Sequence, residues 1–262
     1  MANTPTRADR IRSVAVLVTA LTQAAAAPLT PLLLGASADT GSISDANHTA
    51  ATPAGYAFSI WGLIYLASLV LAVYQLLGSA PASAANRRTG WLLVLAFACS
   101  TVWVPIFGSG LIWLAQVVIF ALVAFLVIAL IRLTRLGPAA SAAERWCLRI
   151  PVGLYLGWAT CASAAGLALT LRWFGTGELG LVPIGVSLLV VVLAVVACLL
   201  VVLRLDALAG FTFTACWALI AVAIGTFSAP VRIAALVGVV AVAAVLVVRT
   251  AQSTHKDVIL LG

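Results

Sequence analysis

Apolar residues along the chain form eight long runs that short polar segments separate. A helix needs about 20 mostly apolar residues to cross the hydrocarbon core of a bilayer, and these runs are of that order. They cover residues 11–34, 55–78, 90–107, 111–133, 149–172, 179–203, 207–227 and 230–249. Several connections between them are very short, as expected for antiparallel neighbours in a helical bundle. The pattern therefore predicts an all-α integral membrane protein.

The composition supports this class and suggests an orientation. The chain of 262 residues is 64% hydrophobic and 8% charged, whereas soluble domains have about 25% charged residues. If the N-terminus lies in the cytoplasm, twelve of the fourteen Lys and Arg residues fall on the cytoplasmic side, and only Arg172 and Arg232 fall outside. Because positive loops stay in the cytoplasm, we expect a multi-pass protein of the cell (plasma or inner) membrane with both termini cytoplasmic. The net charge of +7 then reflects orientation, and no nucleic-acid partner is expected.

The first apolar run has a second interpretation. Its arginines, the segment SVAVLVTALTQ and the four alanines that follow also outline a secretory signal peptide. Pro28, directly after the alanines, is unfavourable behind a cleavage site, and the apolar run continues to Leu34. These features favour a retained first span, but the sequence leaves cleavage of residues 1–27 open.

Chemically reactive groups are scarce inside the runs. All seven Asp and Glu residues and both histidines fall in loops or at the ends of spans. The five cysteines have no metal-ligand spacing, so we interpret them as reduced packing residues. No nucleophile, phosphate-binding or metalloprotease motif is present in the sequence. We therefore predict no catalytic residues and no metal site, and we favour a binding protein over an enzyme.

Aromatic residues are the positive signal. Phe58, Trp61 and Tyr65 are spaced by three and four residues, which places them on one face of a helix. Trp158 falls near the middle of the fifth run, where an interfacial aromatic belt does not account for it. The spacing alone is compatible both with packing against neighbouring helices and with the wall of a ligand site.

Two segments carry a family resemblance. The segment TPAGYAFSIWGLIYL at 52–66 resembles the second-helix signature of the TspO/MBR family, the tryptophan-rich sensory proteins that include the translocator protein or peripheral benzodiazepine receptor. The segment IPVGLYLGWATCASAAG at 150–166 is similar to the fifth helix of that family. The matching positions are Pro53, Tyr56, Phe58, Trp61 and Tyr65 in the first segment, and Pro151, Tyr155, Trp158 and Ala162 in the second.

The resemblance implies a domain organisation. Residues 1–10 would form a cytoplasmic N-terminus, and residues 11–172 a five-helix unit of the TspO type whose long outer loop, 35–54, roofs a pocket. Residues 173–250 would add about three C-terminal transmembrane helices, outside the resemblance, and residues 251–262 a cytoplasmic tail. We expect the ligand site within the first five spans, because most aromatic residues lie there.

The resemblance also implies a ligand class. Family pockets bind porphyrins and related flat apolar molecules, so we expect a tetrapyrrole-like ligand, with porphyrin or haem as a bound ligand and no required cofactor. The partners would be this hydrophobic small molecule and the lipid bilayer, and the small residues of 162–166 could allow a homodimer. His48 could contact a ligand propionate or metal. The expected ligand-binding residues are Tyr56, Phe58, Trp61, Tyr65, Trp103, Trp113, Tyr155, Trp158 and Ala162.

Two other functions stay open at this point. A small secondary transporter would require discontinuous helices or an inverted repeat, and no convincing repeat is present. An intramembrane isoprenoid cyclase would use aromatic rings to stabilise carbocations, but it needs a buried acid. Asp39 and Asp45, in the outer loop, are the nearest candidates for that acid.

Overall fold

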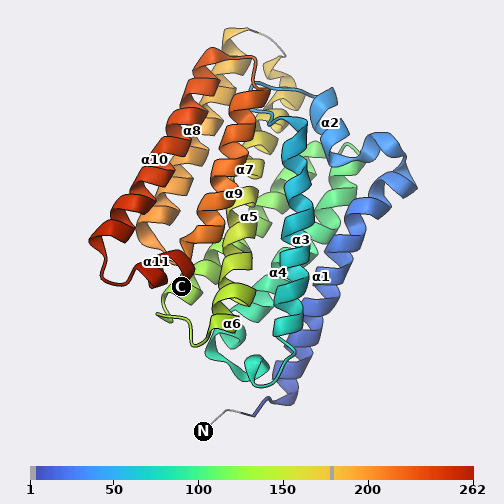
Figure 1. Cartoon of the computed structure of the whole chain (residues 1–262). Helices are drawn as coiled ribbons and strands as arrows, with labels where there is room; N and C mark the ends of the chain where they lie inside the picture. The colour runs from blue at the N-terminus through green and yellow to red at the C-terminus, as the bar shows by residue number, and fades with distance from the viewer. Residues whose placement is uncertain (1–3, 178–179) are drawn as a thin grey trace.

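The computed structural model describes residues 4–177 and 180–262 and is a bundle of long helices (Figure 1). Within these described ranges, eight helical segments are long and apolar enough to cross a membrane, which confirms the predicted class. The long helices are α1 (Arg7–Leu34), α3 (Ile60–Tyr74), α4 (Ala84–Gly108), α5 (Ile112–Thr134), α7 (Ile150–Leu171), α8 (Leu181–Arg204), α9 (Leu208–Gly225) and α10 (Ala229–Gln252). The short helices are α2 (Thr40–Ala46), α6 (Ala142–Glu144) and α11 (Lys256–Leu261).

Irregular turns flank α3 and α7, and those beside α7 extend the fifth span beyond both of its predicted ends. A 3-10 turn, Gly55–Ser59, leads into α3, and π-helical turns, Arg145–Arg149 and Arg172–Thr176, flank α7. Helix α4 begins six residues before the predicted span, because Ser83 caps it and its polar first turns are helical rather than a linker. The tail also forms a short helix, α11, whose Val258 carbonyl accepts a hydrogen bond from Ala207 N.

Helix α7 lies at the centre of the bundle. Every residue from Pro151 to Cys161 is buried, so this helix is covered on all its faces. Helices α3, α5, α8 and α9 pack around it. A helix that is apolar on every face suits such a central position.

Helices α7 and α9 approach each other closely through small residues. A side chain at Gly157 would collide with Phe211 O and Thr214 Oγ1, and one at Gly210 would come within 2.5 Å of Ile150 O. The Thr214 hydroxyl donates a hydrogen bond of 2.8 Å to Leu154 O across the interface. In lipid, such backbone contact and interhelical hydrogen bonding drive association, because the apolar side chains gain little by leaving lipid.

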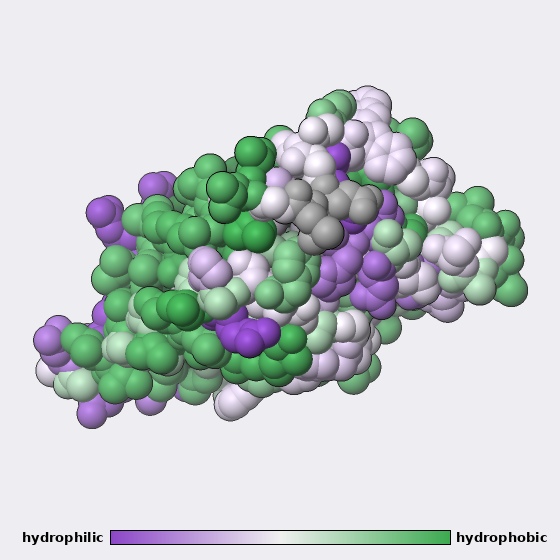
Figure 2. Space-filling view, turned by 90° about the horizontal axis from the view of Figure 1, so that it is seen from above, coloured by the Kyte–Doolittle hydropathy of each residue, from purple (hydrophilic) through white to green (hydrophobic). Residues whose placement is uncertain are grey.

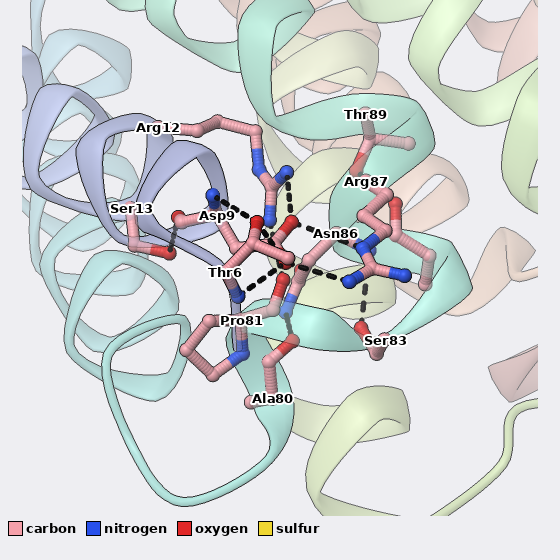
Figure 3. Close-up of polar contacts among 11 residues, drawn as sticks. Thr6, Asp9, Arg12, Ser13, Ala80, Pro81, Ser83, Asn86, Arg87 and Thr89 are labelled. Carbon is pink, nitrogen blue, oxygen red and sulfur yellow. Dashed lines mark hydrogen bonds and ion pairs between the residues drawn. The ribbon is translucent and has the colours of Figure 1, made fainter. Parts of the chain in front are cut away.

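An ionic cluster joins the start of α1 to the start of α4 (Figure 3). The Asp9 carboxylate accepts hydrogen bonds from Arg12 Nη1 at 2.9 Å and from Arg87 Nε and Nη2 at 3.0 and 2.7 Å. Asp9 and Thr6 also cap the first turn of α1 reciprocally. Arg12 reaches on to the carbonyl of Pro81 in the turn before α4. Asp9 and Arg12 are both buried, so each charge depends on the other for compensation.

Positive charge gathers at the end of the bundle that carries both termini (Figure 1). Twelve of the fourteen Lys and Arg residues lie at or near helix ends on this side, and Arg172 and Arg232 lie at the other end. At the first end Arg149 is buried against Glu144, with an Nη2–Oε1 distance of 2.8 Å. The end that carries α2 is called the roof end below.

Replacement of Gly157 by Ala should destabilise the protein by about 1–3 kcal/mol, because its Cβ overlaps the α9 backbone. Gly62→Ala is the matched control, since no atom lies within 4 Å of a Cβ there. The control should be unchanged or up to about 1 kcal/mol more stable. Unfolding titrations of both variants in mixed detergent micelles measure this difference. Equal stability of the two variants would contradict the α7–α9 contact.

Asp9→Asn should lower the free energy of unfolding by about 3 kcal/mol, because the buried Arg12 then lacks a carboxylate. Asp257→Asn provides the control, since Asp257 is exposed in the first turn of α11 at the same end. In the same unfolding titration, the free energy of unfolding of the control should equal that of the wild-type protein. A loss of similar size in both variants would show that the ionic cluster has no special role.

Candidate functional site

A cavity opens at the roof end between the roof loop, residues 35–54, and helices α3, α4, α7 and α9. It holds about 610 Å³ of empty space, counted out to its open mouth. Figure 2 looks onto this end and shows hydrophilic and near-neutral residues beside the hydrophobic flanks of the bundle. The lining residues are Thr40, Ser44, Thr52, Pro53, Phe58, Trp61, Trp103, Phe107, Trp158, Cys161, Ala162, Ala165, Gly166, Leu169, Ala218 and Val222.

Trp61 is the central ring of the cavity wall. Its ring centroid lies 5.8 Å from that of Trp103 and 5.9 Å from that of Trp158, which it meets edge to face. Phe58 packs edge-on against Trp158 at 6.1 Å, and Phe107 stacks on Trp103 at 5.0 Å. Such geometries are favourable for aromatic pairs. Rings from three helices and the turn before α3 therefore hold one another in place around the empty space.

The lining is nearly free of charge. Among the described residues that line the cavity there is no Lys, Arg, His, Asp or Glu. The hydroxyl side chains of Thr40, Ser44 and Thr52 all come from the roof loop, and Cys161 lies on α7. Trp158 is only 1% exposed, and its indole N–H has no hydrogen-bond partner within the described part of the chain. The cavity can therefore stack apolar rings and offers few polar contacts.

The roof loop is held from two sides. Asp39 caps α2 by accepting hydrogen bonds from Gly41 N and Ser42 N at 3.0 and 3.2 Å. Arg172, at the end of α7, donates a hydrogen bond of 2.9 Å to His48 O. The His48 ring lies 6.1 Å from the Phe227 ring and does not line the cavity. The sequence had suggested that His48 contacts the ligand.

Five of the nine residues expected to bind a ligand line the cavity. They are Phe58, Trp61, Trp103, Trp158 and Ala162. Ala162, with its neighbours Ala165 and Gly166, faces this space, so the small residues considered for a homodimer contact belong to the cavity wall.

The other four expected residues lie elsewhere. Tyr65 stacks on Trp61 at 5.4 Å, and Tyr155 meets Trp61 edge-on at 5.9 Å, so both support the wall from behind. Tyr56 is 45% exposed and packs edge-on against Trp217 at 5.3 Å. Trp113 is 49% exposed on the outer surface of α5 and does not line the cavity.

The cavity is not confined to the first five spans, because α9 forms part of its wall. Ala218 and Val222 of this helix line the cavity. Helix α9 also positions the segment before α3, since Ala221 O accepts a hydrogen bond of 2.9 Å from Ala54 N. Trp217 Nε1 donates to Ala57 O at 3.2 Å. In the sequence, Trp217 was the one hint of this role, as an aromatic near mid-membrane in the C-terminal extension.

A small polar group lies directly beneath the aromatic wall. The Tyr155 hydroxyl donates a hydrogen bond of 3.1 Å to Gln23 Oε1 of α1. Gln23 and Ser100 are fully buried, and Gln23 Nε2 has no hydrogen-bond partner among the described residues. The signal for this group in the sequence was the presence of neutral polar residues inside apolar spans, which a search for ionisable residues does not find. The group belongs to the packed core and does not line the cavity.

The fold and the cavity together define a multi-pass helical membrane protein with an aromatic-lined site. The sequence model of the TSPO-like protein family matches residues 11–248, so the chain belongs to this family. The match includes the last three spans, whereas the motif resemblance ended at residue 172. No curated protein and no solved structure shows significant similarity to the chain.

Proposed function

We propose that this protein binds a flat, largely apolar small molecule in the aromatic cavity, with a tetrapyrrole as the leading candidate, in a sensing or transport role. The observation that carries the proposal is the position of Trp61 between Trp103 and Trp158 on the wall of an open, uncharged cavity. A flat ligand stacked on such a wall gains apolar burial, and each well-placed ring pair adds about 0.5–1.5 kcal/mol.

The polarity of the cavity suits a small, largely apolar ligand. Its lining consists of aromatic and other apolar side chains with a few hydroxyl groups, as is usual for ligand pockets. Polar substituents of a bound molecule, such as the carboxylates of a porphyrin, would lie at the mouth beside the hydroxyls of Thr40 and Ser44. There they remain hydrated, because burial of a carboxylate against an apolar wall is strongly unfavourable.

The charge distribution supports an orientation for this site. Cytoplasmic loops carry the excess of Lys and Arg in multi-pass proteins, so the end with twelve positive residues would face the cytoplasm of the cell membrane. Both termini would then be cytoplasmic, and the roof end, with the cavity mouth, would face outward. The ligand would reach the cavity from the outer side of the membrane.

The interior below the cavity favours binding over conduction. Tyr65, Tyr155 and Phe97 are buried beneath Trp61, and Phe97 stacks on Tyr155 at 6.0 Å. A transport role would therefore need these rings to move. For a cyclase, the described lining provides no carboxylic acid, and the nearest candidate, Asp39, already caps α2.

Titration of the purified protein with protoporphyrin IX, followed by tryptophan fluorescence, tests the proposal. We expect saturable quenching with a micromolar Kd that weakens at least tenfold, about 1.4 kcal/mol, in Trp61→Leu. Trp113→Leu is the matched control, since it removes an exposed tryptophan outside the cavity, and its Kd should stay at the wild-type value. Linear quenching, or equal effects of both variants, would mean that the rings only pack the bundle.

Val222→Phe tests whether α9 forms part of the same site. The added ring would fill space on the cavity wall, so the Kd for protoporphyrin IX should rise at least tenfold. Ile224→Phe adds a ring two residues further along α9 at an exposed position and should leave the Kd unchanged. Normal binding by the Val222 variant would place the ligand away from α9.

A further inference from the structure

A side chamber adjoins the cavity between α4, α5 and α7. It holds about 210 Å³ of empty space, counted out to its opening. Trp103, Phe107, Ala162 and Gly166 line both spaces, so the two share a common wall. A ligand stacked on Trp103 in the cavity therefore lies next to the side chamber.

Gln116 of α5 is the polar side chain of this chamber. It is 6% exposed, and its Nε2 donates a hydrogen bond of 3.0 Å to Ser163 O on α7. Because a carbonyl can only accept, this bond fixes the amide with its nitrogen toward α7. Among the described residues no donor is found for the Gln116 Oε1 atom, which is left as an acceptor in the chamber lining.

Gly166 makes room for this oxygen. A Cβ at position 166 would come within 2.5 Å of Gln116 Oε1, closer than atoms in contact allow. The absence of a side chain on α7 therefore sets where the oxygen lies, on the wall that the chamber and the cavity share. Enclosure of an amide oxygen among apolar side chains without a donor is unfavourable, so a ligand that supplies a donor there would be preferred.

We propose that the side chamber is the second arm of the ligand site and that Gln116 selects a molecule that presents a neutral hydrogen-bond donor to the chamber. The molecule has a flat apolar body for the cavity and a short arm that ends in an O–H or N–H group for Gln116 Oε1. The arm is neutral because the described residues lining the chamber lack any charged side chain. This inference rests on the proposed function and adds the chemistry that the ligand must carry.

Two fluorescent probes test the inference. The probe 1-pyrenemethanol has a flat ring system and a hydroxyl on a one-carbon arm, and 1-methylpyrene is its counterpart without a donor. The ratio of their Kd values is measured by tryptophan quenching in the wild-type protein, in Gln116→Met and in the control Val117→Met, which alters the next, exposed residue of α5. The two probes partition differently into detergent, but this difference affects the Kd ratio of every protein equally. It therefore cancels when the ratios of the three proteins are compared.

We expect Gln116→Met to reduce the preference for 1-pyrenemethanol about fivefold, the usual size of one neutral hydrogen bond. Val117→Met should keep the wild-type ratio. Gly166→Ala is a second variant that retains the amide but displaces its oxygen, and it should reduce the preference in the same way. Thermal melting of each variant confirms that it is folded.

The outcomes separate this inference from the proposed function. An unchanged ratio in Gln116→Met and Gly166→Ala would overturn the inference while the cavity remains a ligand site. Saturable binding of protoporphyrin IX without saturable binding of either pyrene would also overturn the inference and leave the cavity as a ligand site. If neither protoporphyrin IX nor the pyrenes bind saturably, both the proposed function and the inference fail.

Discussion

Helices α7 and α9 meet almost backbone to backbone at the centre of the bundle. Lipid offers no hydrophobic drive for two apolar helices to associate, so they must gain from close backbone packing and from hydrogen bonds. Gly157 and Gly210 permit that approach, and the Thr214 hydroxyl bonds across it. Helix α7 provides one wall of the cavity and α9 another, so the same contact also determines the width of the site.

Helix α9 links this contact to the roof of the site. Near its roof end it binds the segment that leads into α3, through the hydrogen bond from Ala54 N to Ala221 O. Gly225 lies so close to the backbone of residues 52–54 that a side chain there would overlap it. The turn that presents Phe58 and Trp61 is therefore positioned from the C-terminal part of the chain. Helix α9, from the C-terminal extension, is therefore an integral part of the cavity wall.

Charge and aromatic surface are separated along the bundle. The buried ion pairs of Asp9 with Arg12 and of Glu144 with Arg149 lie at the end that carries both termini. The cavity at the roof end is lined by rings and small apolar residues, with hydroxyls only from its roof loop. Because charges in a low-dielectric interior need partners, placing them away from the cavity leaves its walls apolar. A ligand site at the roof end is then selective through shape and through a few neutral polar atoms.

The class of the protein, its eight predicted spans and the helix that carries the central rings can all be inferred from the amino-acid sequence. These features can be inferred because the backbone must form helices in lipid. A long apolar run in the sequence therefore identifies a membrane-spanning helix. The regular spacing of Trp61 and Tyr65 placed both on one helical face, and the structure confirms it by their stacking.

The rotation of each helix about its own axis becomes apparent only from the packing of the folded bundle. It turned Trp113 outward and Gln116 inward on the same helix, although they lie only three residues apart. It also brought Ala218 and Val222 of α9 to the cavity. Helices that are apolar on every side have no polar face to mark their outer surface. Their rotation is set instead by where small residues allow neighbouring backbones to meet, and that depends on pairs of residues far apart in the chain.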